Sequence, residues 1–305
     1  MVSKVVLLGT GTPNAEVDKS GPSVAIVAGG NAYLVDFGPG VVRRAKAAFE
    51  LGLHKHRSDK VIEGKEIGDS GIEGIEIGKS GIEGMEISKL RVAFVTHLHS
   101  DHTAGYPDII LTPWVLGRDE PLEVYGPKGI AKMTDHVLKA YGEDIRERVE
   151  GLQPSNEKGW RVVAHEIEEG LVYEDKNVKV KAFRGRHGGL DAYGYRFDTG
   201  DRVITVSGDT SPYDGIAGKY KGSDVLVHEV YSSEGFKRYP SEWQRYHKAM
   251  HTSSTELAEI ASEAMPGLLV LYHQLYNGVS DEELVAEVRS GYDGEVVSGR
   301  DGDVF

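Results

Sequence analysis

The stretch RVAFVTHLHSDHTAG, residues 91–105, places three histidines and an aspartate within six positions, directly after an apolar run typical of a strand. The i, i+2 spacing of His97 and His99 puts both side chains on one face of an extended segment. Asp101 and His102 follow at the turn. Two imidazoles can hold one metal ion, and a carboxylate with an imidazole can hold a second. The pattern H-x-H-x-D-H therefore predicts a two-metal centre rather than a chance polar turn.

Two metal ions need more ligands than these four residues supply. His187 lies in FRGRHGG, a loop between two predicted strands; Asp209 follows the apolar strand of VITVSGDTS, and His273 ends the buried strand of LLVLYHQ. A charged or polar group at the end of a buried strand is costly unless it is bound. We expect these three residues to complete the centre, the alternative for each being a hydrogen-bonded polar residue of the core.

The composition limits the kind of metal ligand, substrate and cellular location that the chain can have. The chain of 305 residues has no cysteine, so any metal must be held by nitrogen and oxygen ligands. The net charge of −13 weighs against a polynucleotide substrate, although it leaves room for a local basic patch. No apolar run approaches the roughly 20 residues of a membrane span, and the start MVSKVVLLGTGTP lacks the apolar region of a signal peptide. We expect a cytoplasmic protein without membrane contact.

Apolar β-branched runs alternate with helical patterns along the chain. We expect strands over residues 4–10, 23–29, 32–38, 91–97, 121–127 and 267–273, and several more between 160 and 231. The expected helices cover residues 40–52, 108–117, 129–145, 252–264 and 280–292. Tyr106 and Trp114 should pack into the core, the alternative being an apolar wall for an aromatic leaving group. This order predicts an α/β fold with sheets covered by helices, formed by one domain over residues 1–305.

Residues 62–88 break the pattern, because the ten-residue unit IEGKEIGDSG is repeated about three times. Each unit offers a short Ile/Glu run and a Gly-Ser turn, which strands joined by tight turns would satisfy. We interpret the segment, at about 60–90, as an exposed insertion that forms a small β-layer or an oligomer arm; the alternative is a lid over the site. We expect a homo-oligomer, in the first place a dimer.

In this order the motifs resemble those of the metallo-β-lactamase superfamily, beginning with Asp36 in LVDFGPG. The resemblance implies a four-layer αββα sandwich of two mixed sheets covered by helices. It implies two divalent metal ions, zinc in the first place, with manganese or iron as alternatives. Asp36 would orient a ligand, unless it is a plain turn aspartate. One ion would be bound by His97, His99 and His187, the other by Asp101, His102 and His273, with Asp209 bridging.

The second half is most similar to the phosphodiesterase-type branch that includes tRNase Z and the arylsulfatases. LVHEVY (226–231) resembles the H-E-A-T motif of that branch, and HTSSTELAEIASEA (251–264) resembles its H-S-T helix. The resemblance implies that Glu229 and His251 relay a proton to the leaving group, so that Asp101, Glu229 and His251 form the catalytic set. The alternatives are that His251 only caps its helix and that Glu229 only orients a neighbour. His228 is a candidate for supporting the site from behind.

We therefore expect a zinc-dependent hydrolase of small phosphate or sulfate esters, with a water between two metals as the nucleophile. Arg184 and Arg186 are candidates for clamping an anionic ester, the alternative being ordinary surface arginines. The loop over residues 7–27 resembles the arylsulfatase-like subgroup, and the Arg-Asn loop and the long basic arm of tRNase Z are not evident. Two further hypotheses stay open: a tRNA 3′-processing endoribonuclease on the same scaffold, and a metal-binding sensor or interaction protein.

Overall fold

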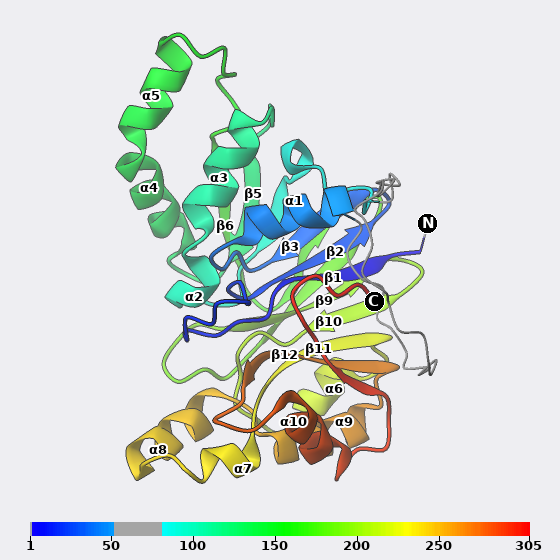
Figure 1. The fold of residues 1–305 in the computed structure, drawn as a ribbon. Helices are drawn as coiled ribbons and strands as arrows, with labels where there is room; N and C mark the ends of the chain where they lie inside the picture. Colours follow the sequence, from blue (N-terminus) through cyan, green and yellow to red (C-terminus); the bar gives the residue numbers. More distant parts are fainter. Residues whose placement is uncertain (1, 52–80) are drawn as a thin grey trace, which may run out of the picture.

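The computed structural model of the chain describes residues 2–51 and 81–305, which form two β-sheets packed face to face (Figure 1). In the first sheet, the three strands at one edge, β1 to β3, pair antiparallel, and the pairs from β3 to β6 are parallel. Its strands, in spatial order, are β1 (Lys4–Gly9), β2 (Ser23–Ala28), β3 (Asn31–Val35), β4 (Val92–Phe94), β5 (Leu122–Gly126) and β6 (Val162–Glu166).

The second sheet is also mixed, with parallel pairs on one side and antiparallel pairs on the other. Its strands, in spatial order, are β13 (Val296–Ser298), β12 (Leu268–Leu275), β11 (Val225–Tyr231), β10 (Val203–Val206), β9 (Tyr193–Asp198), β8 (Lys179–Arg184) and β7 (Gly170–Glu174). The parallel strands at the centre are buried on both faces, as β11 shows along its whole length.

Helices cover the outer faces of both sheets. On the first sheet they are α1 (Val41–Leu51), α3 (Tyr106–Val115) and α4 (Ile130–Ala140); on the second they are α6 (Ile216–Tyr220), α9 (Ser254–Ala264) and α10 (Asp281–Arg289). The remaining helices are η1 (Ile87–Lys89), α2 (Ser100–Thr103), α5 (Gly142–Glu150), α7 (Ser233–Phe236) and α8 (Ser241–Met250). The αββα sandwich implied by the resemblance is thus confirmed.

Alternation along β1 explains how a continuous apolar run serves two cores. Val5 and Leu7 pack between the sheets, whereas Val6 and Leu8 pack under the helices of the first sheet. Because successive side chains of a strand point to opposite faces, a strand buried on both faces needs apolar residues at every position. Among the described residues, no helix combines the length and apolar character that a membrane span requires.

The structure differs from the prediction in one helix and at the end of the repeat. The helix expected over 129–145 is two helices, because α4 ends before Tyr141 and α5 begins at Gly142, a residue that disfavours a helix interior. Tyr106 and Trp114, both on α3, are buried in the core, as predicted. The repeat lies mostly outside the described residues. Its last unit forms the 3₁₀ helix η1 rather than a strand.

That last unit is not exposed. Ile82, Met85 and Ile87 are buried in the core that α1 and α3 cover, because the amide of Ile82 donates to the carbonyl of Ala48 and draws the segment against α1. The prediction of an exposed insertion is therefore wrong for residues 81–88. The rest of the repeat lies outside the described residues.

Candidate metal centre

The predicted ligands come together because each follows or ends a strand. Asp36 directly follows β3, and His97 comes three residues after β4. His187 and Asp209 follow β8 and β10 in the same way, and His273 lies within β12. The turns after the strands of the two packed sheets thereby meet, so residues more than 200 positions apart in sequence share one site.

Two of these residues have an unusual backbone. Asp36 has φ 61° and His273 has φ 46°, in the left-handed region that side chains other than glycine rarely adopt. His273 occupies a bulge in the pairing of β12 with β11, where the register shifts between Glu229 and Val230. A bulge redirects a side chain that regular pairing would leave on the sheet face. Backbone strain of this kind is typical of functional sites.

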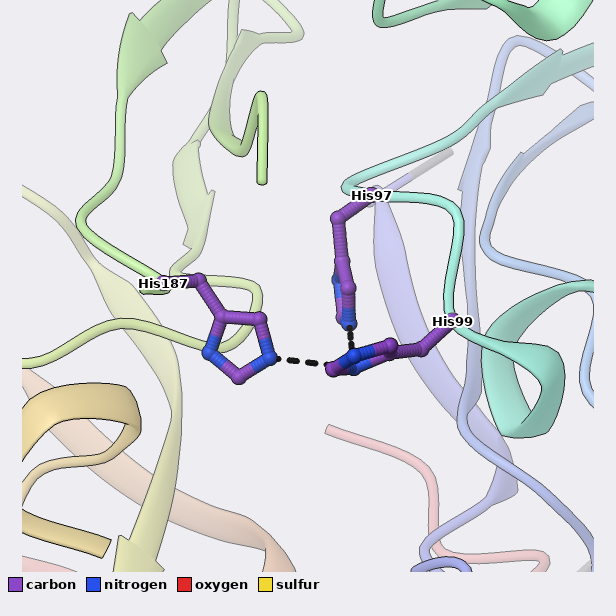
Figure 2. Close-up of side chains that lie close together, drawn as sticks. All are labelled: His97, His99 and His187. Carbon is purple, nitrogen blue, oxygen red and sulfur yellow. Dashed lines mark hydrogen bonds between the residues drawn. The ribbon is translucent and has the colours of Figure 1, made fainter. Parts of the chain in front are cut away.

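The first group of side chains is made of three histidines from two segments: His97 and His99 come from the loop after β4, and His187 comes from the loop after β8 (Figure 2). Nδ1 of His99 lies 3.0 Å from Nε2 of His97 and 3.1 Å from Nε2 of His187. Nδ1 of His187 lies 2.7 Å from the carbonyl oxygen of Met250, which fixes the ring so that Nε2 faces the group. Three ring nitrogens directed at one point are a donor set for a cation.

The second group is made of Asp101, His102 and His273. Oδ2 of Asp101 lies 3.2 Å from Nε2 of His273 and 3.5 Å from Nε2 of His102. Burial alone would lower the pKa of His102, but the carboxylates of Asp209 and Asp36 outweigh burial and raise it well above its usual value. The surroundings of the second group thus favour positive charge.

Asp209 lies between the two groups. Its Oδ2 is 3.5 Å from Nε2 of both His102 and His273, and 3.9 Å from Nε2 of both His97 and His187. Burial would raise the pKa of Asp209, but His273 and His102 hold it well below its usual range. The carboxylate is therefore ionised and placed for contact with both groups, the position that the resemblance assigned to a bridging ligand.

The residues present fit a pair of divalent ions. Nε2 of His102, which faces the carboxylates of Asp101 and Asp209, is buried without a hydrogen-bond partner among the described residues, and such an atom costs free energy unless something binds it. Burial holds the pKa of His97 well below its usual value, which leaves the neutral imidazole that a metal needs. Imidazole and carboxylate donors suit zinc, manganese or iron.

Asp36 contacts His102 on the side of the ring that faces away from the metal position. Its Oδ2 lies 2.8 Å from Nδ1 of His102, while the amide and hydroxyl of Thr96 each donate to the carboxylate at 2.8 Å. A carboxylate that engages Nδ1 fixes the tautomer and directs Nε2 at the metal position. Asp36 is therefore more than a turn aspartate.

Glu229 and His251 form a buried pair next to the second group. Oε2 of Glu229 lies 3.4 Å from Nδ1 of His251, and its Oε1 accepts hydrogen bonds from the amides of Thr210 and Thr252. Burial, reinforced by Asp209, raises the pKa of Glu229 well above its usual value. Burial also lowers the pKa of His251 to about 4. The raised pKa of Glu229 favours its protonated form, and the lowered pKa of His251 favours the neutral imidazole.

Three other predicted residues have different surroundings. The guanidinium of Arg184 pairs with Glu168 and Asp191 and lies over the ring of Tyr193, so its charge is already compensated. Arg186 is exposed and lies over the ring of Tyr213.

The side chain of His228 lies under the helices of the second sheet, where it contacts the hydroxyl of Tyr220 at 3.1 Å and the backbone carbonyl of Glu229, and it reaches none of the metal-ligand side chains. The idea that it supports the centre is wrong, because alternate residues of a strand face opposite ways.

A cavity of about 370 Å³ opens beside the two groups. His99, Asp101, Asp209, His251 and His273 form part of its wall. The opposite part comes from α8 and the residues before it, namely Tyr239, Trp243, Tyr246 and His247. Sequence reasoning missed these four residues. The only local signal was the i, i+3, i+4 spacing of three aromatic rings, which is equally typical of a helix face packed on a core.

Comparison with known proteins agrees with this geometry. Residues 80–274 match the family model described as Beta-lactamase superfamily domain. This chain belongs to the metallo-β-lactamase superfamily. Within that superfamily it is 30% identical over 275 residues to Ribonuclease Z of Mycobacterium sp. (strain KMS), covering 89% of this chain and 84% of that one. The family match and the identity with Ribonuclease Z together confirm the predicted class of enzyme, a metal-dependent hydrolase.

Solved structures of the superfamily share the fold over the full length. The metallo-beta-lactamase fold protein YhfI from Bacillus subtilis matches with a TM-score of 0.70 and 17% identity, covering 99% of this chain and 98% of that one. Human tRNase Z, short form, matches with a TM-score of 0.65 and 19% identity, covering 99% and 98%. At these identities the likeness supports the superfamily fold rather than a particular substrate.

Proposed function

We propose that this chain is a divalent-metal-dependent phosphodiesterase that cleaves RNA, with the 3′ end of precursor tRNA as its substrate. The observation that carries the proposal is the 30% identity with Ribonuclease Z over 89% of the chain. It favours the tRNA-processing hypothesis over hydrolysis of small phosphate or sulfate esters, which the sequence alone placed first.

The two groups around Asp209 would hold the ions, with His97, His99 and His187 at one position and Asp101, His102 and His273 at the other. Ions bound there would supply Lewis-acid activation of water and of the phosphoryl oxygens. Among the protein groups, Asp36 orients His102, and Thr96 in turn holds Asp36.

His251 is placed to give a proton to the leaving oxygen. It lines the cavity, and with Nδ1 turned to Glu229 the other ring nitrogen is left to meet a substrate. The sugar hydroxyl released from a phosphodiester is a poor leaving group without a proton, so a buried donor at this point accelerates its departure. Glu229, held by two backbone amides, lies with Oε2 3.4 Å from Nδ1 of His251 and would supply the ring with its proton.

Local charge supports a polyanionic substrate despite the net charge of −13. The segment over α7 and α8 carries four cations, Lys237, Arg238, Arg245 and Lys248, against the carboxylates of Glu234 and Glu242. It borders the cavity through Trp243 and its neighbours on α8. Lys237 is paired with Glu234, and the other three cations outnumber Glu242. This local excess of positive charge attracts nucleic acid through its phosphates, whereas the rest of the acidic chain repels it.

A small phosphodiester is the second candidate. It is favoured by the acidic chain and by the cavity of about 370 Å³, a size common for small-molecule sites.

Metal-replete protein should be assayed side by side on precursor tRNA, bis(p-nitrophenyl) phosphate and p-nitrophenyl sulfate, with Asp209→Asn as the inactive control. We expect endonucleolytic removal of the 3′ trailer. Turnover of the small diester without any cleavage of precursor tRNA would replace the proposal with the second candidate.

A further inference from the structure

One face of α8 is aromatic and forms a wall of the cavity beside the candidate metal centre. Trp243, Tyr246 and His247 lie at i, i+3 and i+4, a spacing that places them on one side of a helix. Trp243 keeps 51% of its surface exposed and Tyr246 keeps 40%. Burial of a large aromatic side chain is favourable. A ligand that covers these exposed rings would therefore be stabilised by their burial.

The rings form a continuous row that leads to the proton donor. The ring centroids of Trp243 and Tyr246 are 5.6 Å apart, those of Tyr246 and His247 are 5.4 Å apart, and those of His247 and His251 are 5.8 Å apart. The row therefore starts at His251, where the leaving oxygen would lie, and ends at the exposed indole of Trp243.

His247 adds a polar group to this wall. The residue is only 6% exposed, and its Nδ1 has no hydrogen-bond partner among the described residues. A buried ring nitrogen without a partner is unusual in a folded protein. Because His247 lines the cavity, a polar group of a ligand lying along the row can supply the missing hydrogen bond.

We propose that this row is a stacking platform for the nucleobase next to the scissile phosphate, and that Trp243 sets a preference for nucleotides over phosphate esters without a ring. The inference rests on the proposed function, because the phosphate must lie at the metal centre. A phosphodiester with its leaving oxygen at His251 extends its next sugar and base along α8. Aromatic side chains stack on any base, so such a platform tolerates differences in the base that follows the leaving oxygen.

The test is a binding measurement on metal-loaded protein. Adenosine 5′-monophosphate and ribose 5-phosphate carry the same phosphate and sugar, and they differ in the base. Calorimetric titration should show the nucleotide binding at least about fivefold more tightly, the lower end of what stacking on one aromatic ring contributes. Trp243→Ala and Trp243→Leu should both abolish the preference, whereas Trp243→Phe should keep most of it.

Tyr141→Ala is the matched control, because Tyr141 is 41% exposed and does not line this cavity. It should leave the preference unchanged. Equal binding of the two ligands to the unsubstituted protein would overturn the platform, and so would a preference that survives in Trp243→Leu, since apolar area alone would then explain it.

Turnover in the same preparations separates this proposal from the proposed function. Trp243→Ala should raise KM about fivefold for thymidylyl-(3′→5′)-thymidine, in which a base follows the leaving oxygen whichever ester bond breaks, with kcat retained and bis(2,2,2-trifluoroethyl) phosphate, an ester without a ring, unaffected. If the unsubstituted protein hydrolyses both esters and the variant loses neither selectively, the platform is wrong and the phosphodiesterase stands. If the metal-loaded protein hydrolyses neither ester nor precursor tRNA, the proposed function itself is wrong.

Discussion

Oδ2 of Asp36 lies 2.8 Å from Nδ1 of His102, although the two residues are 66 positions apart in sequence. Asp36 accepts further hydrogen bonds from Thr96, so the carboxylate is held in one orientation. It therefore determines which nitrogen of His102 faces the metal position.

Asp36→Asn should weaken metal binding by about 10- to 100-fold, because an amide engages the imidazole less strongly and does not fix its tautomer. Competition with a chromogenic chelator measures the affinity. Ser23→Ala is a suitable control, since its hydroxyl donates to the backbone carbonyl of Asp36 and leaves the carboxylate in place. Unchanged affinity in Asp36→Asn would contradict the orienting role.

The pair of Glu229 and His251 predicts a dependence on the leaving group. His251→Ala should lower kcat by about 10²- to 10⁴-fold for phosphodiesters with an alkoxide leaving group, because the departing oxygen then lacks its proton donor. Esters of nitrophenols need no such proton and should be affected much less. A series of diesters with leaving groups of graded pKa measures this, and an equal loss across the series would rule out proton donation by His251.

Arg118 predicts a coupling with a proline in α3. Pro113 has no amide hydrogen, so the carbonyl of Ile109 lacks its usual helical donor; the guanidinium of buried Arg118 donates to that carbonyl at 3.0 Å. It also donates to the carbonyls of Leu90, Ile110 and Gly159. Arg118→Met should lower the free energy of unfolding by about 3 kcal/mol, since several buried carbonyls lose a charged donor.

Pro113→Ala restores an amide at this position of the helix. In that background the cost of Arg118→Met should be smaller, because the carbonyl of Ile109 regains a donor. Urea unfolding of the four proteins measures the coupling. Strictly additive changes would show that Arg118 does not compensate for the proline.

His228 predicts a dependence of stability on pH. Burial lowers its pKa to about 4. Its Nδ1 contacts the backbone carbonyl of Glu229, and its Nε2 contacts the hydroxyl of Tyr220. Between about pH 6.5 and 4 the unfolded chain binds this proton and the folded chain does not, so stability falls as pH falls, by about 1.4 kcal/mol per unit at most.

His228→Gln removes this titration. It should be less stable than the unsubstituted protein near pH 8, and the difference should narrow as the pH falls from 6.5 to 4. Urea unfolding of both proteins after chelator treatment checks this without metal release. A difference that stays constant over this range would show that His228 titrates normally in the folded chain.

Most of the candidate centre could be predicted from sequence because its residues follow buried apolar runs. The H-x-H-x-D-H pattern is local, and Asp209 and His273 stand where a polar residue is costly. The bulge that turns His273 into the site depends on pairing between two strands and has no local signal.

The surroundings of Arg184 and the wall on α8 escaped prediction for the same reason. Arg184 is compensated by Glu168, which comes from an earlier segment, and sequence spacing gives no hint of that contact. The aromatic spacing of Trp243 and Tyr246 fits a core face as well as a cavity wall. Only the position of α8 beside the cavity in the folded chain shows that this face is a cavity wall.

The most direct test of the account is turnover of bis(p-nitrophenyl) phosphate as a function of bound metal, in chelator-treated protein to which zinc is returned stepwise, with metal content measured on the same samples. The two groups of ligands around Asp209 predict that activity is absent without metal and rises until two ions are bound per chain. Undiminished turnover in the metal-free protein, or full turnover with a single ion, would contradict a two-metal phosphodiesterase.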